Sequence, residues 1–185
     1  MSFRDFQSCG TTRVSEHVSY TPDAAHSVFR YDDFMDSMKD SGKRMDVLVR
    51  ESSGLPMGDS WLVELKDYRR LTRRPNPENS TGLPMTVGRK IADTHRFLVS
   101  SVCPHELSES YLAGAQIHFC LHMELPAAGS VAPPFLNDYR ALVSIAANLS
   151  TGRLPIPTPN HTRVELLNAA IINRSKTYPW SVNLD

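Results

Sequence analysis

Apolar and polar positions along the chain predict three β-strands around its middle. Residues 45–51 and 61–68 are apolar runs of strand length, and the segment between them is rich in Ser, Gly and Pro, which favour turns. We therefore predict that these two strands pair as a hairpin with a long loop. Residues 117–124 alternate between apolar side chains and His, Cys or Glu, which predicts a third strand.

Apolar side chains at helical spacing predict three helices. They recur at steps of three and four residues over 85–102 and over 135–150, and a proline or glycine follows each segment closely. A shorter segment of similar spacing, residues 27–39, predicts a helix before the hairpin that ends near Gly42.

The two ends of the chain are less regular. Residues 1–26 are mostly polar and lack a sustained period, so they predict an arm or a short helix. Residues 163–168 fit either a strand or a helix, and residues 178–184 predict a terminal edge strand. Helices that alternate with strands indicate an α/β fold. We therefore predict one α/β domain over residues 27–185, with a mixed central β-sheet flanked by α-helices.

The composition is that of a folded, water-soluble domain. Hydrophobic residues make up 41% of the 185 residues, which suffices for a single core. Twenty basic residues balance twenty acidic ones, so net charge does not draw the chain to nucleic acid. No apolar run predicts a membrane helix or a secretory signal, and the three cysteines lack CxxC spacing. We expect a cytoplasmic protein with free thiols and no membrane partner.

Charged residues interrupt the two strands of the predicted hairpin. Asp46 lies in the first strand, and Glu64 and Lys66 lie in the second. Charged side chains are costly to bury without partners, so these positions need an explanation. Because side chains alternate between the faces of a strand, Glu64 and Lys66 share one face, and the hairpin brings Asp46 near their strand.

This arrangement resembles the PD-(D/E)XK nuclease superfamily, which has the restriction-endonuclease-like fold. The resemblance covers roughly residues 27–125 and rests on Asp46 in the first strand and "Glu64-Leu65-Lys66" in the second. The proline that precedes the aspartate in many members is absent here. The resemblance implies a mixed sheet in which a helix follows the hairpin.

The resemblance also implies a divalent-metal-dependent nuclease that hydrolyses phosphodiester bonds by attack of water. Asp46 and Glu64 would be catalytic carboxylates that bind Mg²⁺ (or Mn²⁺), with the carbonyl of Leu65 as a further ligand. Lys66 would position the water or offset the charge of the phosphate. DNA is favoured over RNA as the substrate, and bacterial defence or DNA processing is the implied role.

Basic residues near this hairpin are expected to contact nucleic acid. Four arginines directly follow the second strand, where they would bind phosphates flanking the scissile bond: Arg69, Arg70, Arg73 and Arg74. Lys90, in the helix after this loop, belongs to the same expected surface. Together with Asp93 and Thr94 it also resembles a "K-x-x-D-T" segment of some small bacterial members of the superfamily.

Two features of the resemblance stay open in the sequence. Many members use an acidic residue of the first helix, and the spacing does not choose among Glu16, Asp32, Asp33 and Asp36. The sequence also does not decide whether the chain forms a homodimer or joins a protein assembly.

The same residues have alternative explanations. Glu64 and Lys66 can form an ordinary ion pair on a half-exposed sheet face, and Lys90 and Asp93 a surface pair on a helix. A catalytically inactive nuclease-fold protein would act as a nucleic-acid-binding or assembly subunit. An interaction module of unrelated α/β fold predicts that Asp46 and Glu64 lie far apart.

A structural zinc site is a weaker alternative. His118, Cys120 and His122 share one face of the third predicted strand. Zinc takes four ligands tetrahedrally, and alternating side chains of a single strand are too far apart for that geometry. Packing of half-buried residues explains this pattern better.

Overall fold

The larger of the two β-sheets formed by the described residues lies at the centre of the fold. The structure, a computed structural model, describes residues 3–39, 42–52, 58–70, 82–112, 116–127, 129–130, 136–151 and 164–185. The larger sheet has the strand order β1-β4-β5-β6-β7-β8. Its strands are β1 (Gln7–Ser8), β4 (His26–Arg30), β5 (Val47–Glu51), β6 (Ser60–Asp67), β7 (Ile117–Glu124) and β8 (Val164–Leu167). Pairing is antiparallel from β1 to β6 and parallel from β6 to β8, so the sheet is mixed.

A smaller antiparallel sheet and several helices surround this sheet. The smaller sheet contains, in spatial order, β2 (Thr12–Ser15), β3 (Val18–Pro22) and β9 (Trp180–Leu184). The helices are α1 (Tyr31–Ser37), α2 (Leu83–Leu98), α3 (His105–Leu112), α4 (Leu136–Thr151) and α5 (Ala169–Arg174), with a 3-10 helix at Phe3–Phe6. None of these helices is both long and apolar enough to cross a membrane.

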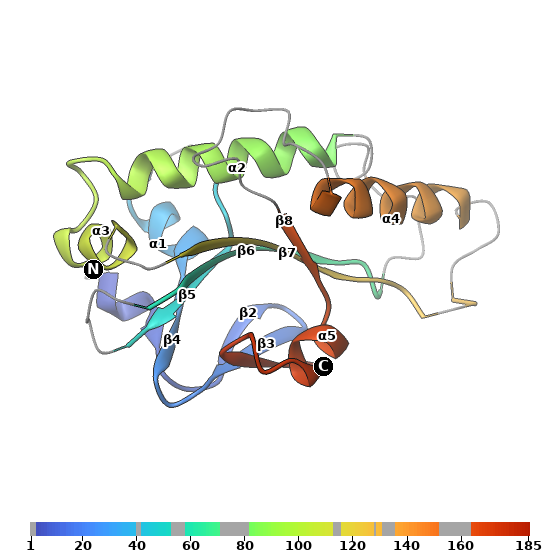
Figure 1. The fold of residues 1–185 in the computed structure, drawn as a ribbon, viewed down its shortest axis with the longest axis horizontal. Helices are drawn as coiled ribbons and strands as arrows, with labels where there is room; N and C mark the ends of the chain where they lie inside the picture. The colour runs from blue at the N-terminus through green and yellow to red at the C-terminus, as the bar shows by residue number, and fades with distance from the viewer. Residues whose placement is uncertain are drawn as a thin grey trace.

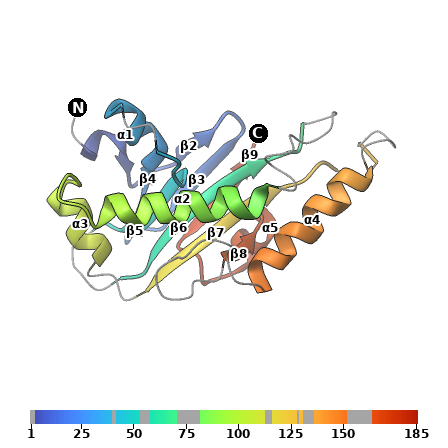
Figure 2. The ribbon, with the colours of Figure 1, turned by 90° about the horizontal axis from the view of Figure 1, so that it is seen from above.

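The molecule has three layers, with the larger sheet in the middle. Figures 1 and 2 show α2 and α4 over one face of this sheet, and Figure 1 shows the smaller sheet and α5 on the other side. Both faces of the central strands are therefore covered. This explains why β5 and β6 contain nearly continuous apolar runs, since a strand buried on both faces needs apolar side chains at successive positions.

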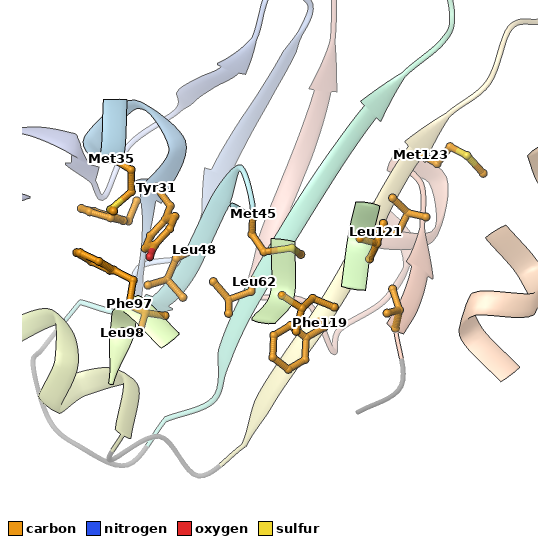
Figure 3. Packing of buried hydrophobic residues seen from close by; sticks show 14 of the residues in the cluster. Tyr31, Met35, Met45, Leu48, Leu62, Phe97, Leu98, Phe119, Leu121 and Met123 are labelled. Carbon is orange, nitrogen blue, oxygen red and sulfur yellow. The ribbon is translucent and has the colours of Figure 1, made fainter. Parts of the chain in front are cut away.

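Large apolar side chains fill the space between the larger sheet and the helices. Leu48 of β5, Leu62 of β6 and Phe119 of β7 are buried on this side. Figure 3 shows them in one cluster with Tyr31 of α1 and Phe97 of α2. Burial of each large apolar side chain stabilises the fold by about 1.5–3 kcal/mol. The cluster therefore holds α2 over the strands of the hairpin.

The opposite face of the larger sheet packs on the smaller sheet. Val47 of β5 and Val63 of β6 are cross-strand partners and point to this side. They belong to a buried cluster with Tyr20 of β3, Trp180 of β9 and Ile172 of α5. Successive residues of β5 and β6 thus alternate between two cores, as the strand period requires.

The predicted elements in the middle of the chain are confirmed. β5 and β6 form the antiparallel hairpin, and β7, α2 and α4 lie within a few residues of their predicted ranges. The segment that fitted either a strand or a helix is the strand β8, and β9 is an edge strand of the smaller sheet. The chain therefore has the predicted α/β architecture, with a mixed central sheet flanked by helices.

The beginning of the chain differs from the prediction. The helix predicted over residues 27–39 is a strand as far as Arg30, and only Tyr31–Ser37 is α-helical. Val28 and Phe29 explain the difference, because these neighbours are buried in the two different cores, one on each face of the sheet. Residues 1–26, predicted as an arm or short helix, instead contribute β1, β2 and β3 to the two sheets. Helices α3 and α5 were not predicted.

Candidate functional site

Asp46 is held at the start of β5 by contacts with two neighbouring elements. Its N–H donates to the carbonyl of Val63 in β6 at 3.0 Å, and its own carbonyl accepts the N–H groups of Tyr31 and Asp32 at 3.1 and 3.2 Å. The side-chain Oδ2 accepts the N–H of Leu65 at 2.7 Å. These contacts fix the carboxylate beside the middle of β6.

Glu64 lies in the middle of β6, and its side chain is completely buried. It points to the helix-covered face, because Leu62 and Tyr68, at even spacing along the same segment, belong to the core on that side. The Nζ of Lys66 lies 2.8 Å from Oε1 of Glu64. The predicted common face of Glu64 and Lys66 is therefore confirmed.

Lys90 of α2 joins the two carboxylates. Its Nζ lies 2.9 Å from Oδ1 of Asp46 and 2.7 Å from Oε2 of Glu64. Since both oxygens contact one nitrogen, the two carboxylates are close together, contrary to what an unrelated interaction module predicts. The alternative surface pair between Lys90 and Asp93 is not formed, because Asp93 pairs with Arg96 at 3.0 Å.

The position of Lys90 follows from its spacing to Thr94. The two residues lie one turn apart and project from the same face of α2. Thr94 is buried, and its Oγ1 accepts the N–H of Met45 at 3.0 Å. This contact fixes α2 over the start of β5 and brings Lys90 to Asp46. The sequence predicted Lys90 as a nucleic-acid contact. The feature of the sequence that relates to its inward position is the four-residue spacing to Thr94, which places both side chains on the same face of α2.

Asp46, Glu64, Lys66 and Lys90 form a cluster of four charged residues, which we call the charge cluster. Burial, and next the charge of Asp46, raise the pKa of Glu64, which the two lysines oppose. Burial alone would lower the pKa of Lys90, but Asp46 and Glu64 outweigh it and the net shift is upward. Lys90 is therefore an ammonium group at neutral pH, and its charge compensates the two carboxylates in a site where an unpaired charge is costly.

The carboxylates of the charge cluster fit a divalent cation in place of the Lys90 ammonium. Oxygen ligands suit Mg²⁺, and Asp46 Oδ1 and Glu64 Oε2 already converge on one positively charged atom. Within the described ranges, no group of three or more His, Cys, Asp or Glu side chains is placed to hold a metal ion. Asp46 and Glu64 are the two carboxylates that converge at this position. Leu65 contributes its N–H to Asp46, and its role as a carbonyl ligand stays a prediction.

A cleft of about 230 Å³ opens beside Asp46, between α1 and β2. Its charged lining consists of Arg30, Asp32, Asp33, Asp46 and Asp67. Partial burial, and next the charge of Asp46, raise the pKa of Asp32. Of the candidate acids near the first helix, Asp32 and Asp33 thus lie at the cleft. Glu16 lies in the turn between β2 and β3 with an 86% exposed side chain, and Asp36 is exposed on α1.

The arginines predicted to bind phosphate divide into two groups. Arg69 forms an ion pair with Asp67 at 2.8 Å and donates to the carbonyl of His17 at 2.7 Å. Arg70 donates to the backbone carbonyl of Asp185 at 2.8 Å. These contacts connect the end of β6 to the smaller sheet. Arg73 and Arg74 lie outside the described residues.

The polar side chains of β7 take part in packing. His118 stacks on Trp61 with ring centroids 5.2 Å apart, and its Nδ1 lies 2.8 Å from an oxygen of Glu165. His122 is completely buried and contacts Glu124 through Nε2 at 2.7 Å. Packing and hydrogen bonds thus explain the pattern that also suggested a zinc site.

Comparisons with known proteins do not assign the chain to a family. No family model matches it, and no solved structure matches it. Among curated proteins, a Cysteine--tRNA ligase of Neisseria meningitidis serogroup A / serotype 4A (strain DSM 15465 / Z2491) is 30% identical over 153 residues. The match covers 75% of this chain but 21% of the ligase. The chain thus spans about a fifth of that relative, and the geometry of the charge cluster is the stronger guide to function.

Proposed function

We propose that the protein is a divalent-metal-dependent nuclease with a restriction-endonuclease-like core. The observation that carries the proposal is the convergence of Asp46, at the start of β5, with Glu64 and Lys66 of β6. The order of elements gives further support, because the β5–β6 hairpin is followed by the helices α2 and α3 and then by β7, which is parallel to β6.

The residues of the charge cluster account for the hydrolysis of a phosphodiester. Asp46 and Glu64 would hold Mg²⁺ or Mn²⁺, which when bound would supply Lewis-acid activation and offset the charge of the phosphate. Lys66 is held at one end of this site by its ion pair with Glu64. From there it orients the attacking water and stabilises the negative charge of the transition state.

The proposed substrate is DNA in preference to RNA, and the proposed role is bacterial defence or DNA processing in the cytoplasm. Both rest on the resemblance of the hairpin residues to the PD-(D/E)XK superfamily. Of the arginines after β6, Arg73 and Arg74 are the proposed phosphate contacts, because Arg69 and Arg70 are bound to Asp67, His17 and Asp185. A homodimer or a protein assembly would place two such sites on a duplex.

A specific observation favours a second candidate, a nuclease-fold protein without catalytic turnover. Lys90 already supplies a positive charge to both Asp46 and Glu64. A charge cluster that needs no metal would hold α2 on the hairpin and leave the protein as a nucleic-acid-binding or assembly subunit.

Cleavage assays with purified protein test the proposed function. Single- and double-stranded DNA and RNA are incubated with Mg²⁺ or Mn²⁺ and with wild type, Asp46→Asn, Lys66→Met or Glu109→Gln. Glu109 is an exposed carboxylate on α3 and serves as the control. We expect wild type and Glu109→Gln to cut DNA, and the two cluster variants to be folded by circular dichroism but at least about 100-fold slower, the usual effect of losing an acid, base or charge-stabilising group. Absence of cleavage on every substrate would favour the candidate without turnover.

A further inference from the structure

We propose that Lys90 is an internal cation that occupies the metal site of this protein and has to leave it before a divalent cation binds. The inference rests on the proposed function and adds a mode of regulation to the same site. It makes metal binding depend on the release of one side chain of α2.

The geometry of the ammonium group supports this competition. Nζ lies 2.9 Å from Oδ1 of Asp46 and 2.7 Å from Oε2 of Glu64, between oxygens of two different strands. A cation bound by the same two oxygens would lie about 2.0–2.6 Å from each, which is nearly the position of Nζ. The two cations therefore exclude each other sterically, and they also repel each other.

Lys66 does not have this role, although it is also bound to Glu64. Its Nζ lies 2.8 Å from Oε1, the other oxygen of that carboxylate. Lys66 and Glu64 also belong to the same strand and share its face. A metal ion between Asp46 and Glu64 therefore leaves the Lys66 ion pair in place and displaces only Lys90.

The Lys90 side chain lies at the border between the buried site and solvent. Lys90 has a long side chain that is 14% exposed, so it reaches the border of the buried site. Partial burial and the charge of Asp46 raise the pKa of Asp32, and the charge of Lys90 opposes them, which places Asp32 within electrostatic reach of Lys90. After displacement, the ammonium group would turn toward solvent at this border, on the side where the charge of Asp32 attracts it.

Direct measurement of Mn²⁺ binding to the full chain tests this inference. Isothermal titration compares wild type with Lys90→Met, which removes the charge but keeps a long side chain. Arg89→Met is the matched control, because it removes a positive charge from the adjacent exposed position of the same helix. Asp46→Asn combined with Lys90→Met identifies the site.

We expect Lys90→Met to bind Mn²⁺ about tenfold or more tightly than wild type, since a neighbouring unit charge is removed. Arg89→Met should stay within about twofold of wild type, because exposed charges are screened, and the double variant should lose the tight binding.

The outcomes separate the inference from the proposed function. Equal or weaker Mn²⁺ binding by Lys90→Met, with binding by wild type that Asp46→Asn abolishes, would overturn the inference and leave the metal-dependent nuclease standing. Absence of Mn²⁺ binding in all variants would overturn both.

Loss of the ammonium group can also unfold the variant, so the fold is followed by circular dichroism with and without Mn²⁺. Lys90→Gln, which keeps neutral N–H donors, is measured in parallel. Recovery of the folded spectrum on addition of Mn²⁺, but not of NaCl at equal ionic strength, would support the inference. Failure of Mn²⁺ to restore either unfolded variant would count against it.

Discussion

The hydroxyl of Tyr20 is hydrogen-bonded to Nδ1 of His122, and this contact joins the smaller sheet to the larger one. Tyr20 belongs to β3 and His122 to β7, and both side chains are completely buried. On its other side the His122 ring contacts Oε1 of Glu124 through Nε2. Because an ionised carboxylate only accepts hydrogen bonds, Nε2 carries the hydrogen of the contact with Glu124, and Nδ1 is the atom that contacts the tyrosine hydroxyl. Three polar side chains are thus connected inside an otherwise apolar interface.

Tyr20→Phe tests the contribution of this contact to stability. The substitution keeps the ring but leaves Nδ1 of His122 buried without its partner. We expect the free energy of unfolding, measured with urea, to fall by about 1–3 kcal/mol. Tyr178→Phe is the control, because its hydroxyl donates to Glu165 at a partly exposed site, and we expect a loss below about 1 kcal/mol. If both variants lost the same free energy of unfolding, the buried hydrogen bond between Tyr20 and His122 would not contribute more to stability than the partly exposed one.

Glu124 makes part of the stability depend on pH. Burial alone would raise the pKa of Glu124, but hydrogen bonds from His122 and from the N–H of Ala169 outweigh it and lower the pKa. The folded state therefore binds a proton less readily than the unfolded state. The contribution of Glu124 is complete above the pKa of an unfolded glutamate, about 4.3, and is lost as the pH falls through the lower folded pKa.

Urea unfolding of Glu124→Gln between about pH 3 and pH 7 checks this dependence. At pH 7 we expect the variant to be less stable than wild type by about 1.5–3 kcal/mol, since a charged hydrogen bond is lost. The difference should shrink at the acidic end, where wild type loses the same contribution. Glu109→Gln, at an exposed carboxylate of α3, should follow wild type throughout. A difference for Glu124→Gln that does not change with pH would contradict the assigned linkage.

Thr94 connects the helix α2 to the start of β5. We expect its hydroxyl group to contribute more to the stability of the fold than the size of its side chain. In Thr94→Val the shape is kept, but the N–H of Met45 loses its acceptor inside the protein. We expect the free energy of unfolding to fall by about 1–3 kcal/mol. Thr94→Ser keeps the hydroxyl and serves as the control. If Thr94→Val proved as stable as Thr94→Ser, another group would have to accept the hydrogen bond of Met45.

Local patterns predicted the strands that carry the charge cluster. Period-two alternation placed Glu64 and Lys66 on one face of β6, and the turn-rich segment before Ser60 predicted the hairpin that brings Asp46 to them. Lys90 was harder to place, because a lysine on an amphipathic helix is usually solvated. Its four-residue spacing to Thr94 places both residues on one face of α2, and the position of α2 above the sheet, fixed by Thr94, shows that this face and the ammonium group point inward.

The first strands could not be predicted because their partners are distant in sequence. β3 pairs with β9, so that Tyr20 lies opposite Val182. Their apolar residues are buried only when the two ends of the chain meet. A short stretch of sequence around β3 therefore does not reveal its pairing with β9. The strand β4 is followed directly by α1, so the apolar residues of both elements form one series. The spacing of this series is close to that of a single helix, which explains the helix predicted over residues 27–39.

Substitutions of the arginines after β6 should have two different effects, one on stability and one on DNA binding. Arg69 is bound to Asp67 and to the carbonyl of His17, so Arg69→Gln should mainly lower the free energy of unfolding, by about 1 kcal/mol. If Arg73 and Arg74 bind phosphates, as the sequence predicts, Arg73→Gln combined with Arg74→Gln should weaken DNA binding uniformly across sequences. Fluorescence anisotropy between about 50 and 200 mM salt measures both the affinity and its salt dependence. The slope of log K against log salt should become shallower by about 2 for the double variant and stay unchanged for Arg69→Gln. A similar loss of slope in Arg69→Gln would instead mean that Arg69 leaves Asp67 and binds the nucleic acid.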